Sequence, residues 1–326
     1  MHSLSFLLSL RLALAFHPDL GLGLLERQRQ PQRQQPYRNS HFLHAVKSLA
    51  TSSKAVELKW ADFSKNHEDA VAVPVVLLHG LLGSKRNFAT IAGSLASQLE
   101  QKRRIIGLDL RNHGENHHDW RDGMAYREMA ADVLLFMDSQ GLDKVVLVGH
   151  SVGGKVAQMV ALLEPERIEG LVVIDIAPVT YTTQEPHWRA VHDIVEVLNS
   201  VELTQSVTKR DVDLQLRDAV PDPALRAFLL TNLDVATGCW KIHLEGIAAQ
   251  MEELAGFDID PLCHSYPGDV FFIHGGQSRF VRHAYMDSIA AYFPNHMLTT
   301  IRGVGHWVHA EAPDDTAALL KRFLDR

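Results

Sequence analysis

The chain has 326 residues and a formal net charge of -7, with 46% hydrophobic and 22% charged residues. These values are typical of a globular protein that can build a substantial core, as one large domain or two small ones. The excess of acidic residues argues against a protein that binds nucleic-acid phosphates, and the composition leaves no room for a protein with many membrane spans. Two cysteines, Cys239 and Cys263, are too few for a disulfide framework.

The beginning of the chain differs from the rest in composition. Residues 1–56 contain seven basic and two acidic residues. They combine a Leu/Ser/Ala stretch (residues 4–16) with a Gln/Arg/Pro-rich run (residues 27–38) that cannot build a packed core. A basic, acid-poor start of this kind is typical of an organelle transit peptide, with a secretory signal or a merely disordered tail as alternatives. We therefore expect a targeting leader over residues 1–54, followed by the folded domain.

Short and nearly continuous apolar runs recur along the remaining chain. Runs of about five such residues indicate strands that are buried on both faces of a parallel sheet. Helical periodicity separates them, so we predict an α/β fold with a mostly parallel sheet flanked by helices. The expected strands cover residues 75–79, 105–109, 145–148, 171–175, 270–274 and 297–301, and the expected helices cover residues 88–99, 126–140, 155–163 and a segment from about 313.

The alternation of strands and helices stops between about residues 178 and 267. Helical patterns punctuated by Pro and Gly replace it, at residues 188–198, 224–230 and 247–255. We expect a helical cap inserted over the carboxyl edge of the sheet, where ligands bind in open α/β sheets. The apolar cap residues either line an acyl pocket or form an ordinary cap core; they are Phe228, Leu229, Leu230 and Trp240.

A G-x-S-x-G sequence at residues 149–153 lies between an expected strand and an expected helix. In that context it indicates a nucleophile elbow, in which the glycines allow a sharp turn and leave the serine hydroxyl free. Ser151 is therefore the candidate nucleophile, and the Val152 N–H at the start of the helix is a candidate oxyanion donor. The second donor is expected from the glycine-containing loop 79–84, with Leu81 as the candidate. A phosphate-binding loop is the alternative there, although its consensus is not matched.

A histidine flanked by glycine near the C-terminus, His306, is the candidate general base. It follows the expected strand 297–301 and precedes the expected last helix, so it can reach the sheet edge beside the serine. An imidazole with a pKa of about 6.5 can accept and return a proton near neutral pH. His309 is expected instead at a helix entry or on the surface.

The acid of a catalytic triad is the member that the sequence leaves open. It is expected after the strand that precedes the histidine strand, within residues 275–281, but Ser278 stands there in place of an aspartate. Asp175 is the first substitute, because a carboxylate at the end of a buried strand needs a partner to offset its burial. Glu245, from the expected cap, is the second substitute.

A histidine-rich loop follows the expected strand 105–109. Its candidate metal ligands are His113, His117, His118 and Asp119. They lack the H-E-x-x-H spacing of a helical zinc site and have no cysteine partner. We therefore expect no metal site and a solvated loop, or a loop at the rim of a pocket.

These motifs, in this order, resemble those of the alpha/beta-hydrolase superfamily, and within it those of small bacterial esterases, from about residue 56 to the C-terminus. The blocks that carry the resemblance are residues 79–84, 109–114, 149–155, 173–178, 274–281 and 305–310. The resemblance implies a serine hydrolase that cleaves acyl or lipid esters through an acyl-enzyme, without a cofactor. It implies Asp175 as the acid in the bacterial relatives and leaves Glu245 as the alternative from the animal ones.

The resemblance also implies a mitochondrial location for the eukaryotic members, with plastid or cytoplasm as alternatives here. The fold alone does not fix the function. A module that keeps this fold in order to bind or protect a protein partner in the organelle is therefore the alternative to an enzyme with a small-molecule substrate.

Overall fold

The computed structural model describes residues 55–64, 70–118 and 120–326. The expected leader, residues 1–54, and one of the candidate metal ligands, Asp119, lie outside the described residues. Among the helices of the described part, none combines the length and the apolar character that a membrane crossing requires.

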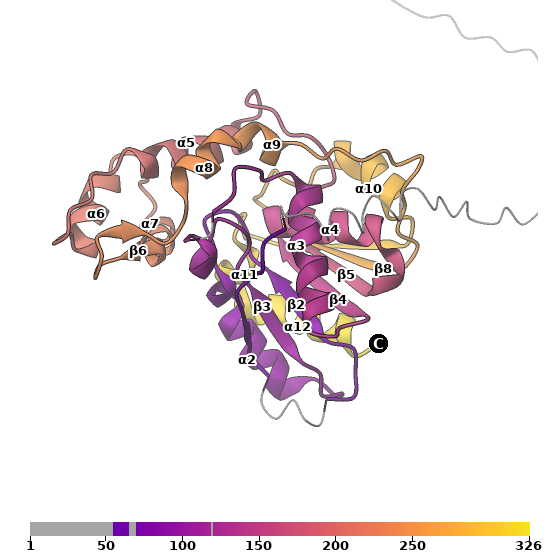
Figure 1. Cartoon of the computed structure of the whole chain (residues 1–326). Coiled ribbons are helices and arrows are strands. Elements are labelled where there is room, and N and C mark those ends of the chain that lie inside the picture. Colours follow the sequence, from indigo (N-terminus) through magenta and orange to yellow (C-terminus); the bar gives the residue numbers. More distant parts are fainter. Residues whose placement is uncertain (1–54, 65–69, 119) are drawn as a thin grey trace, which may run out of the picture. The chain divides into compact units, whose positions relative to one another are not determined.

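A sheet of seven strands in the order β1-β3-β2-β4-β5-β8-β9 forms the centre of the described part (Figure 1). β1 pairs antiparallel with β3, and all the other neighbours pair in parallel. All residues of β2, β3 and β4 are buried, as the continuous apolar runs predict. The strands are β1 (Trp60–Asp62), β2 (Val75–Leu78), β3 (Ile105–Leu108), β4 (Val145–His150), β5 (Ile168–Ile174), β8 (Asp269–Gly275) and β9 (His296–Ile301). The predicted α/β class and the six predicted strands are confirmed.

Helices cover both faces of the sheet and create one apolar cluster on each. α3, α4 and α10 pack on one face, and α2, α11 and α12 pack on the other. The helices of the core are α2 (Ala89–Gln98), α3 (Tyr126–Ser139), α4 (Val152–Leu163), α10 (Met286–Tyr292), α11 (Val308–Glu311) and α12 (Pro313–Leu324), with short 3-10 turns η2 (Lys85–Phe88), η3 (Gly114–Asn116), η4 (Pro165–Arg167) and η6 (His283–Tyr285). Because the parallel strands run in one direction, their carboxyl ends and the loops that follow them meet at one edge of the sheet.

A mainly helical segment lies between β5 and β8, and we call it the cap. Figure 1 shows its elements gathered beyond the carboxyl end of the sheet. They are α5 (Pro186–Asn199), α6 (Lys209–Leu216), α7 (Pro223–Leu229), η5 (Leu230–Asn232), the short hairpin β6 (Leu233–Asp234) and β7 (Cys239–Trp240), α8 (Leu244–Ala249) and α9 (Met251–Ala255). The expected helix over residues 247–255 is in fact two helices, α8 and α9, that meet at Gln250.

Lys155, one turn after Ser151 on α4, joins the end of the cap to the core. Its Nζ atom donates to the carbonyl oxygens of Ala255 at 2.8 Å and Gly256 at 2.6 Å, and lies over the ring of Tyr181 at 4.7 Å from the centroid. The Tyr181 N–H also donates to the Ala255 carbonyl, at 3.0 Å. Burial lowers the pKa of the Lys155 ammonium group well below its usual range. The amine of Lys155 therefore connects the beginning of the cap, at Tyr181, and its end, at Ala255 and Gly256, to α4.

Candidate active site

Ser151 stands at the sharp turn between β4 and α4. Its backbone has φ 51° and ψ -121°, a conformation that a residue with a side chain adopts only when its surroundings impose it. A side chain at Gly149 would collide with the backbone of Gly153, and one at Gly153 would collide with the carbonyl of His79. The glycines on either side of the serine are therefore required by the close approach of strand and helix, as the elbow pattern predicts.

His306 lies between β9 and α11 and faces the serine. Its Nε2 atom is 3.0 Å from the Ser151 Oγ atom, within hydrogen-bond distance. Two neighbours hold it in place: the Nε2 of His150 donates to the His306 carbonyl at 2.9 Å, and the Phe280 ring lies against the imidazole, with 4.2 Å between centroids. The candidate base is thus fixed through its backbone and through one face of its ring.

Asp175, directly after β5, completes the series of hydrogen bonds. It is fully buried, and its Oδ2 atom accepts from the Nδ1 of His306 at 2.7 Å. Its Oδ1 atom accepts from the Gly275 N–H at 3.0 Å, and the hydroxyl of Ser278 donates to Oδ2. Ser278, which occupies the expected place of the acid, thus hydrogen-bonds to Asp175, the candidate acid from the neighbouring strand. The other candidate acid, Glu245, lies exposed in the first turn of α8, and the structure does not bring it to His306.

Both residues that carry the candidate oxyanion donors lie close to Ser151. Leu81 lines the same cavity as Ser151, and a Cβ atom at Gly80 would lie 2.6 Å from the His150 Nδ1 and 3.2 Å from the Ser151 Cβ. Gly80 therefore allows this loop to pass directly beside the serine. Val152 is the first residue of α4, and the N–H groups of a first helical turn have no partner within their helix. The structure thus brings both residues close to Ser151, and their N–H groups remain the predicted oxyanion donors.

Two buried, neutral histidines stabilise the loop that contains Leu81 and Leu82. His113 accepts from the Leu82 N–H at 3.1 Å through Nε2 and donates to the Arg111 carbonyl at 2.8 Å through Nδ1. Burial lowers the pKa of His113 to about 3, with the neighbouring His79 as a further cause. His79 itself accepts from the Leu110 N–H at 2.9 Å. The expectation of a solvated or pocket-rim loop is confirmed for His117, which lines a cavity together with Gly114 and Glu115. It is wrong for His113, which is fully buried and whose imidazole supports the loop beside Ser151.

His309 is likewise a core residue. It lies in α11, so its expected place at a helix entry is correct, but its exposure is only 5%. Its ring stacks on Phe88 at 4.9 Å and meets His150 at 4.4 Å between centroids. Burial lowers its pKa to about 3. The alternative expectation of a surface residue is wrong, since Phe88 and His150, both far away in the sequence, enclose it.

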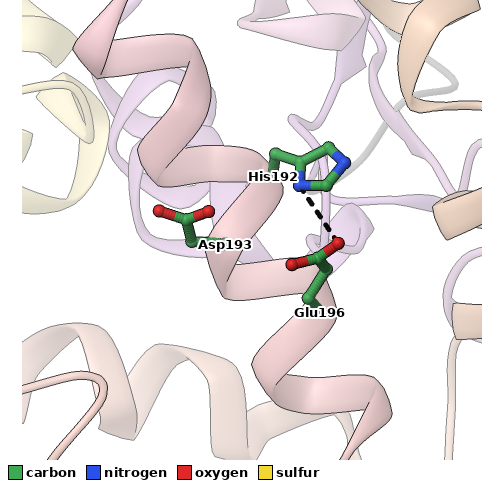
Figure 2. A group of neighbouring side chains, drawn as sticks. All are labelled: His192, Asp193 and Glu196. Atoms are coloured by element: carbon green, nitrogen blue, oxygen red, sulfur yellow. Dashed lines mark ion pairs between the residues drawn. The ribbon is translucent and has the colours of Figure 1, made fainter. Parts of the chain in front are cut away.

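A group of possible metal ligands does occur within the described ranges, away from the histidine-rich loop. His192, Asp193 and Glu196 lie on α5 with one potential ligand atom each, all within 4.8 Å of one another (Figure 2). The His192 Nδ1 atom is 3.5 Å from the Glu196 Oε1 atom, one helical turn away. Asp193 and Glu196 are exposed, so the contact has the character of a solvated i, i+4 ion pair.

A small cavity of about 30 Å³ opens above Ser151. Apart from His150, Ser151 and His306, its walls are apolar: Leu81, Leu82, Val191, Ile194, Phe228, Leu229 and Trp307. Four of these residues belong to α5 and α7 of the cap. Of the cap residues considered as an acyl pocket, Phe228 and Leu229 line the cavity, whereas Leu230 and Trp240 do not. The cap therefore closes the site with an apolar wall.

Comparison with known proteins places the chain among hydrolases. The family of the alpha/beta hydrolase fold matches residues 73–194. The chain is 38% identical over 256 residues to a protein of Xenopus laevis named sn-1-specific diacylglycerol lipase ABHD11, covering 77% of this chain and 80% of that protein. The chain therefore belongs to the alpha/beta hydrolase family.

The chain is also similar to two esterases. The chain is 34% identical over 252 residues to Esterase YbfF of Escherichia coli (strain K12), covering 77% of this chain and 93% of that protein. The solved structure of a marine microorganism esterase superposes with a TM-score of 0.76 at 30% identity, covering 83% of this chain and all of that one. Together these relatives identify the protein as an ester hydrolase, and the expected fold and enzyme class are confirmed.

Proposed function

We propose that the protein hydrolyses acyl esters of lipids through an acyl-enzyme formed on Ser151. The observation that carries the proposal is the continuous series of hydrogen bonds from Asp175 through His306 to Ser151, at 2.7 and 3.0 Å. In this series His306 is the base, and Asp175 holds its tautomer and stabilises the imidazolium that forms.

The mechanism has two halves that use the same groups. The Ser151 Oγ attacks the ester carbonyl while its proton moves to the Nε2 of His306, and the N–H groups of Leu81 and Val152 bind the oxyanion. When the C–O bond breaks, His306 returns this proton to the departing alcohol and an acyl-serine ester remains. Water then attacks the acyl group, gives a proton to His306 and releases the carboxylic acid, and Ser151 recovers its proton.

Two observations support a lipid ester as the substrate. The cavity above Ser151 has apolar walls, which suit an acyl chain. The frog relative is named a diacylglycerol lipase, a hydrolase of esters with a glycerol alcohol. We therefore propose acylglycerols or related lipid esters as the substrate class.

The test replaces Ser151 with alanine in the full chain. We expect hydrolysis of a p-nitrophenyl ester and of a diacylglycerol to fall at least 10³-fold, together with loss of labelling by a fluorophosphonate. Ser97→Ala, on the exposed side of α2, is the matched control and should keep both. Equal turnover by Ser151→Ala and its parent would overturn the mechanism. A cellular phenotype that persists in the inactive variant would favour the role as a partner-binding module.

We also propose that residues 1–54 direct the protein to the mitochondrion. The support is compositional: the basic and acid-poor character of this segment. A fluorescent protein fused to residues 1–54 should accumulate in mitochondria. Accumulation in plastids or diffuse cytoplasmic fluorescence would overturn this part of the proposal.

A further inference from the structure

The loop that carries Leu81 forms a tight turn in which Leu82 has an unusual backbone conformation. The Gly83 N–H donates to the Gly80 carbonyl at 3.0 Å, so Leu81 and Leu82 occupy the two central positions of the turn. The φ of Leu82 is 58°, which is typical of a type II turn and favours glycine or asparagine at this position. Leucine favours a type I turn instead, in which the peptide group between the two central residues is reversed. Contacts from outside the turn must therefore maintain the observed conformation.

Two hydrogen bonds hold the backbone of Leu82, one from the core and one from the cap. Its N–H donates to the Nε2 atom of His113 at 3.1 Å. Its carbonyl accepts from the Nδ2 atom of Asn232 at 2.7 Å, across 150 residues of sequence. The N–H belongs to the peptide group before Leu82 and the carbonyl to the peptide group after it. Neither peptide group can therefore rotate without losing a hydrogen bond.

Asn232, the last residue of η5, is itself fixed by other contacts of the cap. It is 3% exposed, and its carbonyl accepts from the Lys241 N–H at 2.7 Å. The cap segment that follows Lys241 also binds the core, because the His243 N–H donates to the Asn112 carbonyl at 2.9 Å. These contacts do not involve Leu82. The position of the Asn232 amide is thus determined independently of the turn that it holds.

The turn lies directly beside the proposed nucleophile. Leu81 and Leu82 both line the cavity above Ser151. The Leu81 N–H is a predicted oxyanion donor, and such a donor must lie about 3 Å from the place where the oxyanion develops. It contributes to the rate only while it is held in this geometry. A relaxed turn would therefore slow the reaction even in a protein whose fold is intact.

We propose that Asn232 is a positioning residue for ester hydrolysis, because its amide holds the Leu82 carbonyl and so maintains the turn that presents the Leu81 N–H to the oxyanion. This inference rests on the proposed function and adds a residue of the cap to it. Asn232 acts through the backbone of Leu82, so the groups that react all belong to the core. A purely structural asparagine would instead contribute to stability and leave the rate at each active site unchanged.

The test replaces Asn232 with aspartate in the full chain. Aspartate has the same size, but its carboxylate only accepts hydrogen bonds and would face the Leu82 carbonyl, another acceptor. We expect kcat for a p-nitrophenyl ester to fall 10- to 100-fold, somewhat less than the loss of a whole oxyanion donor, while KM stays within twofold. The value of kcat is expressed per site that a fluorophosphonate labels after prolonged incubation, so misfolded molecules do not count. Asn199→Asp, at an exposed position at the end of α5, is the matched control and should change neither value.

The introduced carboxyl group gives a second measurement that a structural role does not predict. Its buried position raises its pKa, and once protonated it again carries an O–H group that can donate to the Leu82 carbonyl. The ratio of variant kcat to parent kcat should therefore rise as the pH is lowered from 7 to 5. Asn232→Leu, which introduces no titratable group, should lose kcat to a similar extent at both pH values.

Two results would overturn the proposal. A kcat of Asn232→Asp within twofold of that of the parent would show that the amide does not maintain the oxyanion donor. A lower free energy of unfolding with an unchanged kcat per labelled site would show a purely structural role. Labelling of the parent at Ser151 separates these failures from a failure of the proposed function. A parent and a variant that both label at Ser151 and hydrolyse the ester at equal rates retain the triad chemistry and contradict only the role of Asn232.

Discussion

The carboxyl edge of the sheet and the cap contribute different things to the same site. The three members of the proposed triad come from loops after β4, β5 and β9, each anchored in the core. The four cap residues that line the cavity come from α5 and α7 and are all apolar. Strands buried on both faces hold their terminal loops rigidly, whereas amphipathic helices can vary on a shared scaffold. We infer that the core determines the reaction and the cap determines which ester reaches it.

The largest expected effect tests whether the acid comes from the core or from the cap. Asp175→Asn should lower kcat about 10³- to 10⁴-fold, because an amide can hold His306 in the wrong tautomer and cannot stabilise its imidazolium. Glu245→Gln, the matched change in the cap, should leave kcat within twofold. Steady-state kinetics of ester hydrolysis would decide, and a larger loss for Glu245→Gln would place the acid in the cap.

The next prediction tests the contact between the cap and the core. Lys155→Met removes two hydrogen bonds to the end of the cap, and we expect the free energy of unfolding to fall by about 2 kcal/mol. Lys144→Met is the control, because Lys144 forms an exposed ion pair with Glu169 that contributes little. Urea unfolding of both variants measures the difference. An equal loss of unfolding free energy in the two variants would contradict the role of Lys155 in joining the cap to the core.

The cap residues that line the cavity should affect selectivity for the acyl chain, with a smaller energetic effect. Phe228→Ala enlarges the apolar cavity, so we expect the ratio of kcat/KM between long and short acyl chains to change by about tenfold while fluorophosphonate labelling persists. Leu214→Ala, at a half-exposed position on α6, removes a similar apolar group from the cap away from the cavity. Chain-length profiles that coincide for the two variants would contradict a role of the cap in acyl selection.

The last prediction concerns the pH dependence that the buried histidines of the core give to stability. The pKa values of His113 and His309 are lowered to about 3, whereas an unfolded histidine titrates near 6.5. Below pH 6.5 the unfolded chain therefore binds protons that the folded chain does not, and stability is lost as the pH falls from 6.5 toward 3. Each histidine should contribute a slope of about 1.4 kcal/mol per pH unit between these two pKa values.

Unfolding curves at pH 7, 6 and 5 measure this slope. His113→Gln should be less stable at pH 7 but should show a shallower loss on acidification than its parent. His283→Gln, at an exposed position in η6, is the control and should leave the slope unchanged. A parent slope that His113→Gln retains in full would show that this imidazole already titrates in the folded protein.

The parts of the molecule that sequence predicts best are those set by local chemistry. The buried strands stand out as apolar runs, and the turn at Ser151 requires glycine at fixed spacing. The short strand β1, the hairpin β6–β7 and the helix α6 were not predicted, because two or three residues or a largely polar helix leave little periodic signal. Helix α6 buries only Val212 and Leu216.

The side-chain environment is harder to predict because it depends on distant residues. Asp175 was one of two candidate acids, and only the fold brings it to His306, 131 residues away. His309 illustrates the same limit, since its neighbour Phe88 comes from another element. A burial requirement, as for Asp175, is the signal that sequence does carry, because a charge in an apolar segment must find a partner.

The apolar lining of the cavity above Ser151 also bears on the second half of the reaction. Apart from His150, Ser151 and His306, the residues around the cavity are apolar. Apolar surface does not hold a water molecule by hydrogen bonds, so the water that attacks the acyl-serine must be held mainly by His306. Deacylation should therefore depend on His306 as strongly as acylation does, whichever alcohol has left.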